Sequence, residues 1–249
     1  PMIILAAKNP SDCFTMAFEA ARLSLEHMTP AILLTDGFIA NGSEPWKLPD
    51  PHKDFPKIKT RFANPEDYKE KTFFPYERDS DKLARMWATP GMPNLMHRIG
   101  GLEKEENTGN VSYDPHNHEL MVRTRQEKVD RVANYIPEQE VLGKHSGDLL
   151  IVSWGGTYGA TYQAVSQAQK AGKKVSLMHM RYLNPMPKNT ETILKGFKKI
   201  VVAELNAGQL KNIINARYNC NALGYNKVQG KPFMIRELTQ MIETELEKL

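Results

Sequence analysis

The sequence has little cysteine and no long apolar run, and each shortage disfavours a class of protein. Cys13 and Cys220 are the two cysteines among 249 residues, and they lie far apart with no metal-like spacing. A disulfide-rich secreted domain is therefore disfavoured, and a reduced, cytoplasmic protein is the simplest interpretation. No apolar run reaches the roughly 18 residues that a membrane helix needs, and no signal peptide is visible. We therefore expect no membrane association.

The sequence also has no large excess of positive or negative charge. Lys and Arg number 33 and Asp and Glu number 29, which gives a formal net charge of +4 with no basic stripe. Nucleic acid is therefore not an expected partner. The sequence contains neither a P-loop nor a G-x-G-x-x-G motif, and its spacing assembles no Ser/His/Asp or Cys/His arrangement. The histidines have no zinc-like spacing, so a metal site is disfavoured. The residues alone thus indicate no self-contained active site.

The most regular pattern lies in residues 148–180, which read as strand, glycine turn, helix and strand. Residues 149–154 form a continuous apolar run, as expected for a strand that is buried on both faces of a parallel sheet. The run breaks at Gly155-Gly156, and a helix leads to a second apolar run at 175–180. This order predicts a parallel sheet with a right-handed crossover. The helix repeats apolar residues three or four apart: Tyr158, Tyr162, Val165 and Ala168.

A second β-α-β pattern occupies the beginning of the chain. We expect a strand at 2–6, a helix at about 10–27 and a buried strand at 31–35 that ends in Asp36-Gly37. N-cap residue types precede the helix, and its apolar face is predicted to be Phe14, Phe18, Ala21 and Leu25. Because residue 1 is a proline and strand-like sequence starts at once, we expect the last third of a larger α/β domain in a longer chain.

Residues 41–147 differ in character, because prolines recur and periodicity is poor. A structureless connection this long is improbable within a compact domain unless it is functional or held by a partner. A charged helix is expected at 118–135, with apolar positions Met121, Val122, Val129 and Val132. Solvated linkers are not rich in aromatic residues, so we expect this segment to be ordered and to pack across another subunit. Its aromatic residues include Trp46, Phe55, Phe62, Tyr68, Phe73, Phe74, Tyr76 and Trp87.

The rest of the chain continues the α/β pattern. A helix at 190–197 should lead to a strand at 199–204, and a helix at 210–218 should follow. A weak strand is possible within 219–225, and an amphipathic helix at 234–249 closes the chain. The residues expected to point inward from that helix are Ile235, Leu238, Met241, Ile242 and Leu246.

The glycine turn at 155–159 leaves two interpretations open. It follows a strand and opens a helix, so its backbone N–H groups could hold an anion. Tight helix–sheet packing explains the glycines as well and is preferred, because a lone glycine turn is weak evidence. No acidic residue ends the second strand at 178–181, which argues against a dinucleotide ribose site.

Longer stretches of sequence are more specific. They are LTDGF at 34–38, NGSEPW at 41–46, HRIGGLE at 97–103, TGNVSYDP at 108–115, WGGTYG at 154–159, LNP at 183–185, ELNAGQL at 204–210 and KVQGKPF at 227–233. Taken in order, they resemble the α subunit of 2-oxoacid:ferredoxin oxidoreductases, and most of all its 2-oxoglutarate type. The resemblance extends over essentially the whole chain.

The resemblance implies a fold and a reaction. Residues 1–40 would end a thiamine-diphosphate pyrimidine-type domain, 41–147 would be a connecting region with one helix, and 148–249 would be a transketolase-C-terminal-like, parallel-sheet α/β domain. Thiamine diphosphate with Mg²⁺ would be shared with a β subunit that also carries an iron–sulfur cluster. The implied reaction is oxidative decarboxylation of a 2-oxoacid to its acyl-CoA, with coenzyme A as co-substrate and electrons passing to ferredoxin. The implied assembly is a heterodimer or a dimer of heterodimers.

The resemblance assigns no catalytic residue here, because the family's activating glutamate would precede residue 1, and we expect the chain alone to be inactive. Candidate cleft or subunit-interface residues are Asp36, Gly37, His97, Arg98, Gly100, Gly101 and Glu103. Asp36-Gly37 ends a strand where open α/β sheets place ligands, and Arg98 beside His97 suits a carboxylate. A structural turn with solvated charges is the competing interpretation of that loop. For the whole chain, the alternatives are a Rossmann-like nucleotide-binding domain and a purely structural assembly domain.

Overall fold

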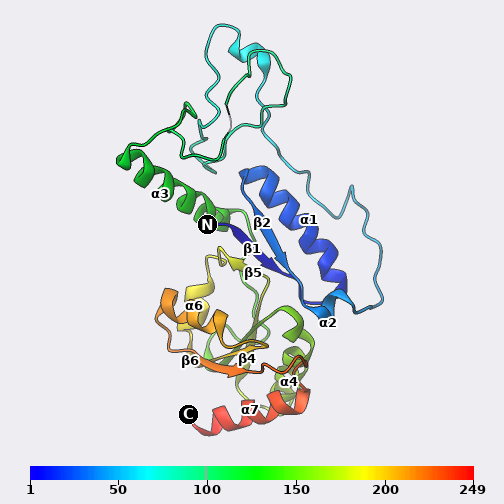
Figure 1. The fold of residues 1–249 in the computed structure, drawn as a ribbon. Coiled ribbons are helices and arrows are strands. Elements are labelled where there is room, and N and C mark those ends of the chain that lie inside the picture. Colours follow the sequence, from blue (N-terminus) through cyan, green and yellow to red (C-terminus); the bar gives the residue numbers. More distant parts are fainter. Residues whose placement is uncertain (99) are drawn as a thin grey trace. The chain divides into compact units, whose positions relative to one another are not determined.

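The chain divides into two compact units. The computed structural model describes residues 1–98 and 100–249, so Ile99 of the HRIGGLE stretch lies outside the described residues. Unit 1 comprises Pro1–Ile3, Phe18–Ile32 and Lys47–Tyr135, and unit 2 comprises Ile4–Ala17, Leu33–Trp46 and Ile136–Leu249. Figure 1 shows the ribbon with its elements labelled.

Unit 2 is built on a parallel sheet whose strand order is β4-β3-β6-β7. Strand β3 (Gly147–Trp154) pairs in parallel with β4 (Val175–Met180) on one side and with β6 (Phe197–Glu204) on the other. β7 (Leu223–Asn226) extends β6 in parallel. The parallel α/β fold expected from the apolar runs is therefore confirmed. The weak strand is confirmed as well, since β7 begins within the predicted segment 219–225 and ends one residue beyond it.

Helices cover both faces of this sheet. Leu149 and Ile151 of β3 pack on one face with α4 (Tyr158–Lys170) and α7 (Ile235–Glu247). Leu150 and Val152 pack on the other face with α5 (Thr190–Lys195) and α6 (Gln209–Tyr218) (Figure 1). Because successive strand residues point to opposite faces, the uninterrupted apolar run in β3 supplies two cores at once.

A smaller sheet has the order β2-β1-β5. It contains β2 (Ala31–Leu34), β1 (Ile3–Ala6) and β5 (Tyr182–Asn184), which pairs antiparallel with β1. The sequence predicted β1 and β2 but missed β5. Three residues that run directly into a Pro-rich turn are too short to show a period-two pattern.

The predicted apolar face of α1 (Pro10–His27) is wrong. Phe14 is 48% exposed and Leu25 is 38% exposed, whereas Met16 and Leu23 are fully buried. The aromatic side chains of α1 meet the irregular segments instead. Phe14 lies 5.0 Å from Trp46 and Phe18 lies 4.5 Å from Phe55, measured between ring centroids. In the sequence, aromatic residues of a helix that contact a loop cannot be distinguished from residues that face the core.

Other helices also bury a narrower set than expected. Val122 of α3 (Pro115–Arg131), Tyr162 of α4 and Ile235 of α7 are exposed, while their neighbours Met121, Val165 and Leu238 are buried. Each exposed residue lies at the border of its apolar stripe. The sequence does not define the exact width of an apolar stripe on a helix. A period of 3.6 residues locates the centre of the stripe but not which of its border residues contact the neighbouring layer.

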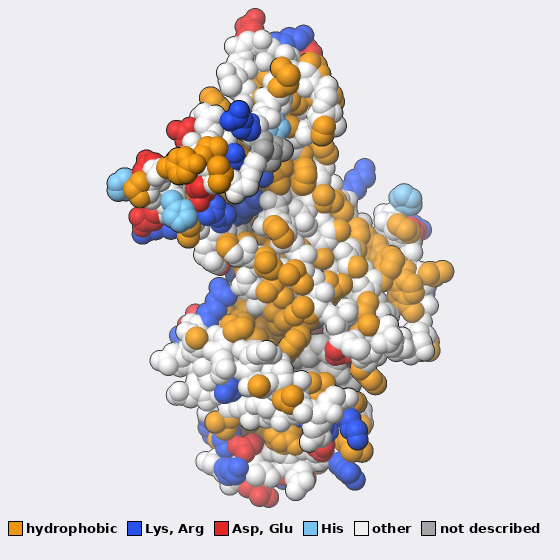
Figure 2. All heavy atoms as spheres, viewed as in Figure 1, with side chains coloured by type: hydrophobic (Ala, Val, Ile, Leu, Met, Phe, Trp, Pro, Cys, Tyr) orange, Lys and Arg blue, Asp and Glu red, His pale blue; other side chains and the backbone are white. Residues whose placement is uncertain are grey.

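Unit 1 has little regular structure besides α3 and the part of α1 from Phe18 onward. Its irregular strands are joined by single bridges, which pair Arg78 with Arg85 and Lys104 with Val111. A small core contains Ala63, Tyr68, Phe73 and Leu95. Hydrophobic side chains also lie at its surface (Figure 2), and Leu48, Met96 and Tyr113 are 78%, 89% and 86% exposed.

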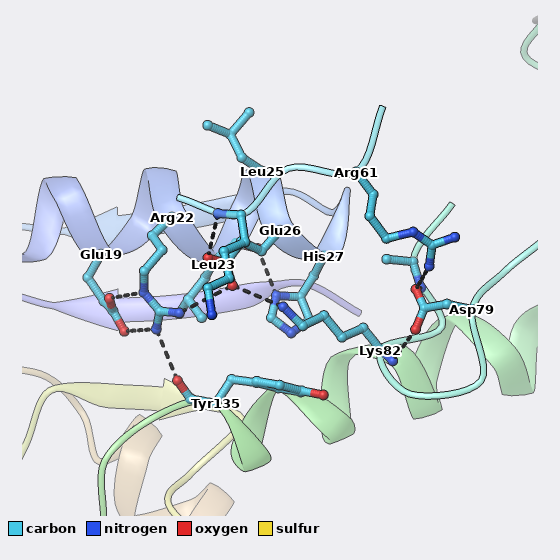
Figure 3. Close-up of polar contacts among 12 residues, drawn as sticks. Glu19, Arg22, Leu23, Leu25, Glu26, His27, Arg61, Asp79, Lys82 and Tyr135 are labelled. Carbon is cyan, nitrogen blue, oxygen red and sulfur yellow. Dashed lines mark hydrogen bonds and ion pairs between the residues drawn. The ribbon is translucent and has the colours of Figure 1, made fainter. Parts of the chain in front are cut away.

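A charged network joins the end of α1 to the irregular segments of unit 1 (Figure 3). The carboxylate of Glu26 accepts from the Lys82 ammonium at 3.0 Å and lies 3.5 Å from the Arg22 guanidinium. Burial alone would raise the pKa of Glu26, but the N–H of Lys59 and the Lys82 ammonium outweigh burial and hold this pKa below its ordinary value. Glu26 is thus a charged group that connects α1 to the irregular segments within unit 1.

Among residues 1–98 and 100–249, none of the helices combines the length and the apolar character that spanning a membrane requires.

Lys128 of α3 is a buried cation that makes folding sensitive to pH. Its ammonium donates to the carbonyl of Met28 at 2.7 Å. Burial first, and then Arg85 and Arg78, lower the pKa of Lys128 to about 7, whereas an unfolded lysine titrates near roughly 10.4. The unfolded chain therefore binds more protons between these two values. As a consequence, this residue makes the protein more stable as pH rises through that window.

We expect Lys128→Met to remove part of this pH dependence. The free energy of unfolding of the wild type should rise relative to that of the variant by about 1 kcal/mol per pH unit between roughly pH 7 and 9. Urea unfolding at several pH values measures the difference, with the exposed Lys173→Met as the matched control. Parallel pH curves for wild type and Lys128→Met would contradict the assignment.

Candidate functional site

The carboxyl edge of the unit 2 sheet has the topology of a ligand site. The chain leaves β3 toward β4 on one side, and β6 lies on the other side of β3. The strand order therefore reverses between β3 and β6, which is where open α/β sheets bind ligands. A cavity of about 260 Å³ opens there, lined by Leu34, Thr35, Asp36, Trp154, Gly155, Gly156, Thr157, Leu205, Asn206 and Gln209.

Asp36 fills the glycine turn at this edge. One carboxylate oxygen accepts from the N–H of Gly156 at 2.8 Å. The other caps the short helix α2 (Gly37–Ala40) by accepting from the N–H of Ile39 at 2.9 Å. A Cβ at Gly156 would overlap the Asp36 carboxylate, so glycine is required for the close approach. The turn does hold an anion, and that anion is a side chain of the same chain.

Glu204 fills the equivalent position at the end of β6. Its side chain is fully buried. The carboxylate accepts from the N–H groups of Leu210 and Lys211, each at 2.9 Å, at the beginning of α6. It also accepts from the Asn206 amide at 2.9 Å and from the Trp154 indole at 3.3 Å. A buried carboxylate with four donors is well stabilised, and it joins the ends of β3 and β6 to the start of α6.

This edge is arranged to hold and position rather than to react. Its lining contains no Lys, Arg, His or Cys, and the two oxygens of Asp36 already accept backbone N–H groups. Across the described residues, no group of three or more His, Cys, Asp or Glu side chains could hold a metal ion. The residues that line the cavity therefore offer no cationic side chain and no thiol to a ligand.

The predicted candidate residues fall in both units, and each set is described within its own unit. Asp36 and Gly37 belong to unit 2. His97 and Arg98 are exposed loop residues of unit 1, and the Nδ1 of His97 lies 2.8 Å from the carbonyl of Leu95. Gly100 and Gly101 are exposed as well.

Glu103 is anchored to α3 rather than free. Its carboxylate lies 3.1 Å from the Arg125 guanidinium and 2.7 Å from Nδ1 of His118. The hydrogen bonds from Arg125 lead the causes that lower its pKa. Glu103 thus fixes the end of the loop to the helix, and Arg98 is the exposed cation that the loop presents.

Sequence reasoning named Asp36 but missed its partner Gly156 and missed Glu204 altogether. The glycine turn was interpreted as helix–sheet packing, because the ligand of a turn cannot be identified when it lies 120 residues away in sequence. The role of Glu204 could have been predicted from the sequence. A carboxylate that ends an apolar strand and precedes Asn206 and Gly208 at a helix start is a capping pattern.

The comparisons with known proteins agree along the whole chain. Residues 1–115 match the family described as pyruvate flavodoxin/ferredoxin oxidoreductase, thiamine diphosphate-binding, and residues 147–238 match pyruvate:ferredoxin oxidoreductase core domain II. Subunit KorA of the 2-oxoglutarate oxidoreductase of Mycobacterium tuberculosis is 44% identical over 99% of this chain and 37% of its own length. Subunit alpha of 2-oxoacid:ferredoxin oxidoreductase 1 of Aeropyrum pernix is 26% identical over 96% of this chain and 38% of its own length.

A solved structure agrees with these relatives. The 2-oxoglutarate:ferredoxin oxidoreductase of Magnetococcus marinus, with 2-oxoglutarate, coenzyme A and succinyl-CoA bound, superposes with a TM-score of 0.90 at 31% identity. The match covers 99% of this chain and 42% of that chain. This chain thus spans about two fifths of the length of the proteins it matches.

The contact between Asp36 and Gly156 predicts a specific double-mutant result. Gly156→Ala should lower the free energy of unfolding by about 2 kcal/mol, because its Cβ overlaps the carboxylate. In an Asp36→Ala background, the same change should cost less than about 1 kcal/mol, since the clash is gone. Denaturant unfolding measures both values.

Gly159→Ala is the matched control. No atom lies within 4 Å of a Cβ there, so alanine in this helical position should be neutral or stabilising. Equal costs for Gly156→Ala in both backgrounds would contradict the contact.

Proposed function

Because the chain belongs to the α-subunit family of 2-oxoacid:ferredoxin oxidoreductases, of which it represents a part, we propose that it serves in the oxidative decarboxylation of 2-oxoglutarate. The product would be succinyl-CoA, with electrons passing to ferredoxin. The similarity to the Magnetococcus enzyme, which extends over nearly every residue of this chain, carries this proposal. The substrate assignment follows two relatives that are 44% and 31% identical to this chain, both of which are named for 2-oxoglutarate.

The active site would be shared with a β subunit. Residues 1–115 match a thiamine diphosphate-binding family, and the described residues form no group of three or more His, Cys, Asp or Glu side chains that could hold a metal ion. We assign Mg²⁺ and the diphosphate to a site shared with the β subunit. We also assign to that subunit the iron–sulfur cluster that passes electrons to ferredoxin. Coenzyme A would be the co-substrate, and the assembly would be a cytoplasmic heterodimer or a dimer of heterodimers.

The domain boundaries expected from the sequence belong to this proposal. Residues 1–40 would complete a pyrimidine-type domain, 41–147 would pack across the β subunit, and 148–249 would be the transketolase-C-terminal-like domain. The exposed apolar side chains of unit 1 support a covered surface, because Met96 and Tyr113 are 89% and 86% exposed. This region is rich in the aromatic residues that protein interfaces favour.

The chemistry would come from the cofactor, and this chain would supply position. Bound thiamine diphosphate stabilises carbanions, which is the hard part of decarboxylation. In this chain, Asp36 and Glu204 hold the turns at the carboxyl edge in fixed geometry. Fixed backbone around a cleft lowers the cost of orienting reactants.

A nucleotide-binding role is disfavoured by the same two carboxylates. A phosphate needs free N–H groups at a glycine turn or helix start. The N–H of Gly156 is held by Asp36, and those of Leu210 and Lys211 are held by Glu204. A phosphate there would meet a like charge instead of a donor.

Enzyme assays of the assembled complex test the proposed function. Reduction of a viologen dye should require 2-oxoglutarate, coenzyme A and thiamine diphosphate together, and pyruvate should be a poorer substrate. The chain purified alone should show no turnover, because it holds only part of one half-site. Turnover by the isolated chain, or a complex inactive with 2-oxoglutarate and active with another 2-oxoacid, would overturn the assignment.

The loop from His97 to Glu103 gives a sharper prediction. We place it at the subunit junction near the cofactor cleft, where exposed Arg98 would meet a carboxylate of substrate or partner. Arg98→Ala should then lower turnover or subunit association at least about tenfold, since a charge-assisted hydrogen bond is worth roughly 1.5 kcal/mol or more. Steady-state kinetics and analytical ultracentrifugation of the complex measure the effect. The exposed Arg236→Ala serves as control, and wild-type behaviour of Arg98→Ala would show an ordinary surface loop.

A further inference from the structure

A second cavity in unit 2 lies beside the carboxyl ends of β1 and β4. Its volume is about 290 Å³. Lys8 follows β1, Arg181 follows β4, and both line this cavity with His179 and Tyr158. None of these residues lines the cavity between β3 and β6. The proposed function therefore leaves this group of side chains without a role.

Two cations border the cavity, and Glu138 and Glu140 line it as well. The guanidinium of Arg181 holds Asp12 through Nε, at 3.0 Å from the carboxylate, and through Nη2. Its Nη1 forms no hydrogen bond within the described part of the chain. The Lys8 ammonium lies 5.0 Å from the centre of the Tyr158 ring, and no carboxylate of residues 1–98 or 100–249 pairs with it. Lys8 is thus held by an aromatic face and is available to an anion.

His179 has one assignment of its protons that satisfies all its neighbours. Ser153 Oγ lies 2.7 Å from Nδ1 of His179 and 3.2 Å from the Thr161 hydroxyl. The Thr161 hydroxyl lies 2.9 Å from the carbonyl of Thr157, which can only accept. The three hydrogen bonds of this chain therefore need one hydrogen each from the Thr161 hydroxyl, the Ser153 hydroxyl and the His179 ring. Thr161 donates to the carbonyl, Ser153 donates to Thr161, and Nδ1–H donates to Ser153.

This assignment leaves Nε2 of His179 as a bare acceptor. Nε2 is buried and has no hydrogen-bond partner in the described part of the chain. Burial first, and then Lys8 and Arg181, lower the pKa of His179 to about 3, so the ring stays neutral near neutral pH. Buried polar atoms without partners are rare in folded proteins. Here the unused acceptor belongs to a ring that lines a cavity.

The same charges decide which donor suits Nε2. Lys8 and Arg181 are close enough to disfavour a positive charge on His179, so they also disfavour a cationic donor such as an ammonium group. A neutral hydroxyl carries no such penalty. The cations in turn suit a carboxylate on the same ligand. The Tyr158 ring packs edge-on against the imidazole, with the ring centroids 4.9 Å apart.

We propose that this cavity binds a small hydroxycarboxylate, with its carboxylate at Lys8 and Arg181 and its hydroxyl donating to Nε2 of His179. The site is separate from the cavity between β3 and β6 and does not depend on the proposed function. It would act as an effector or second-ligand site.

Calorimetric titration of the assembled enzyme tests the site with three matched probes. Malate has the hydroxyl, succinate lacks it, and aspartate replaces it with an ammonium group. Malate should bind at least about tenfold more tightly than succinate, because only malate satisfies the buried acceptor. Aspartate should bind more weakly than malate. Equal affinities for malate and succinate, or no binding of malate at millimolar concentration, would overturn the proposal.

Two variants separate the two halves of the site. His179→Asn keeps a donor to Ser153 and removes the Nε2 acceptor, so it should abolish the preference for malate over succinate. Lys8→Met should weaken both ligands about equally. The exposed Lys173→Met removes the same charge elsewhere in unit 2 and should change neither. Malate binding that survives both Lys8→Met and His179→Asn would assign it to another site and contradict the proposal.

Discussion

The carboxyl edge of the unit 2 sheet depends on backbone N–H groups that are satisfied by the protein's own carboxylates. Glu204 is fully buried and accepts from two N–H groups at the start of α6 as well as from two side chains. Asp36 does the same for the turn after β3 and for the start of α2. Unpaired buried donors would cost about 1–3 kcal/mol each. These two side chains therefore allow two glycine-containing turns to lie next to each other without an external anion.

This arrangement explains how a fold that resembles a nucleotide-binding domain can serve another purpose. In open α/β sheets, the positions after the strands attract phosphates. Here the backbone N–H groups at those positions already donate to the carboxylates of Asp36 and Glu204, so they are not free to bind a phosphate. Fixed turns of this kind suit the role proposed above, in which this chain helps to position a cofactor.

The sequence was informative where one physical effect dominated. The apolar runs of β3 and β6 predicted a parallel sheet, because only strands covered on both faces can be apolar at every position. It was misleading where an apolar side chain could pack either in the core or against a loop, and where a strand was very short. Phe14 looked like core and instead contacts Trp46, and β5 was too short to show a period. Asp36 was identified from its place after a strand, but its bond to Gly156 is a long-range contact that one sequence does not reveal.

Equilibrium unfolding of Glu204→Gln tests most directly whether internal carboxylates organise this edge. An amide can replace only part of the acceptor set, so the free energy of unfolding should fall by about 2 kcal/mol or more. The fluorescence of Trp154, whose indole donates to Glu204, should change with it. The exposed Glu243→Gln removes the same charge and should leave both measurements unchanged. A Glu204→Gln protein as stable as Glu243→Gln, with unaltered fluorescence, would contradict the account.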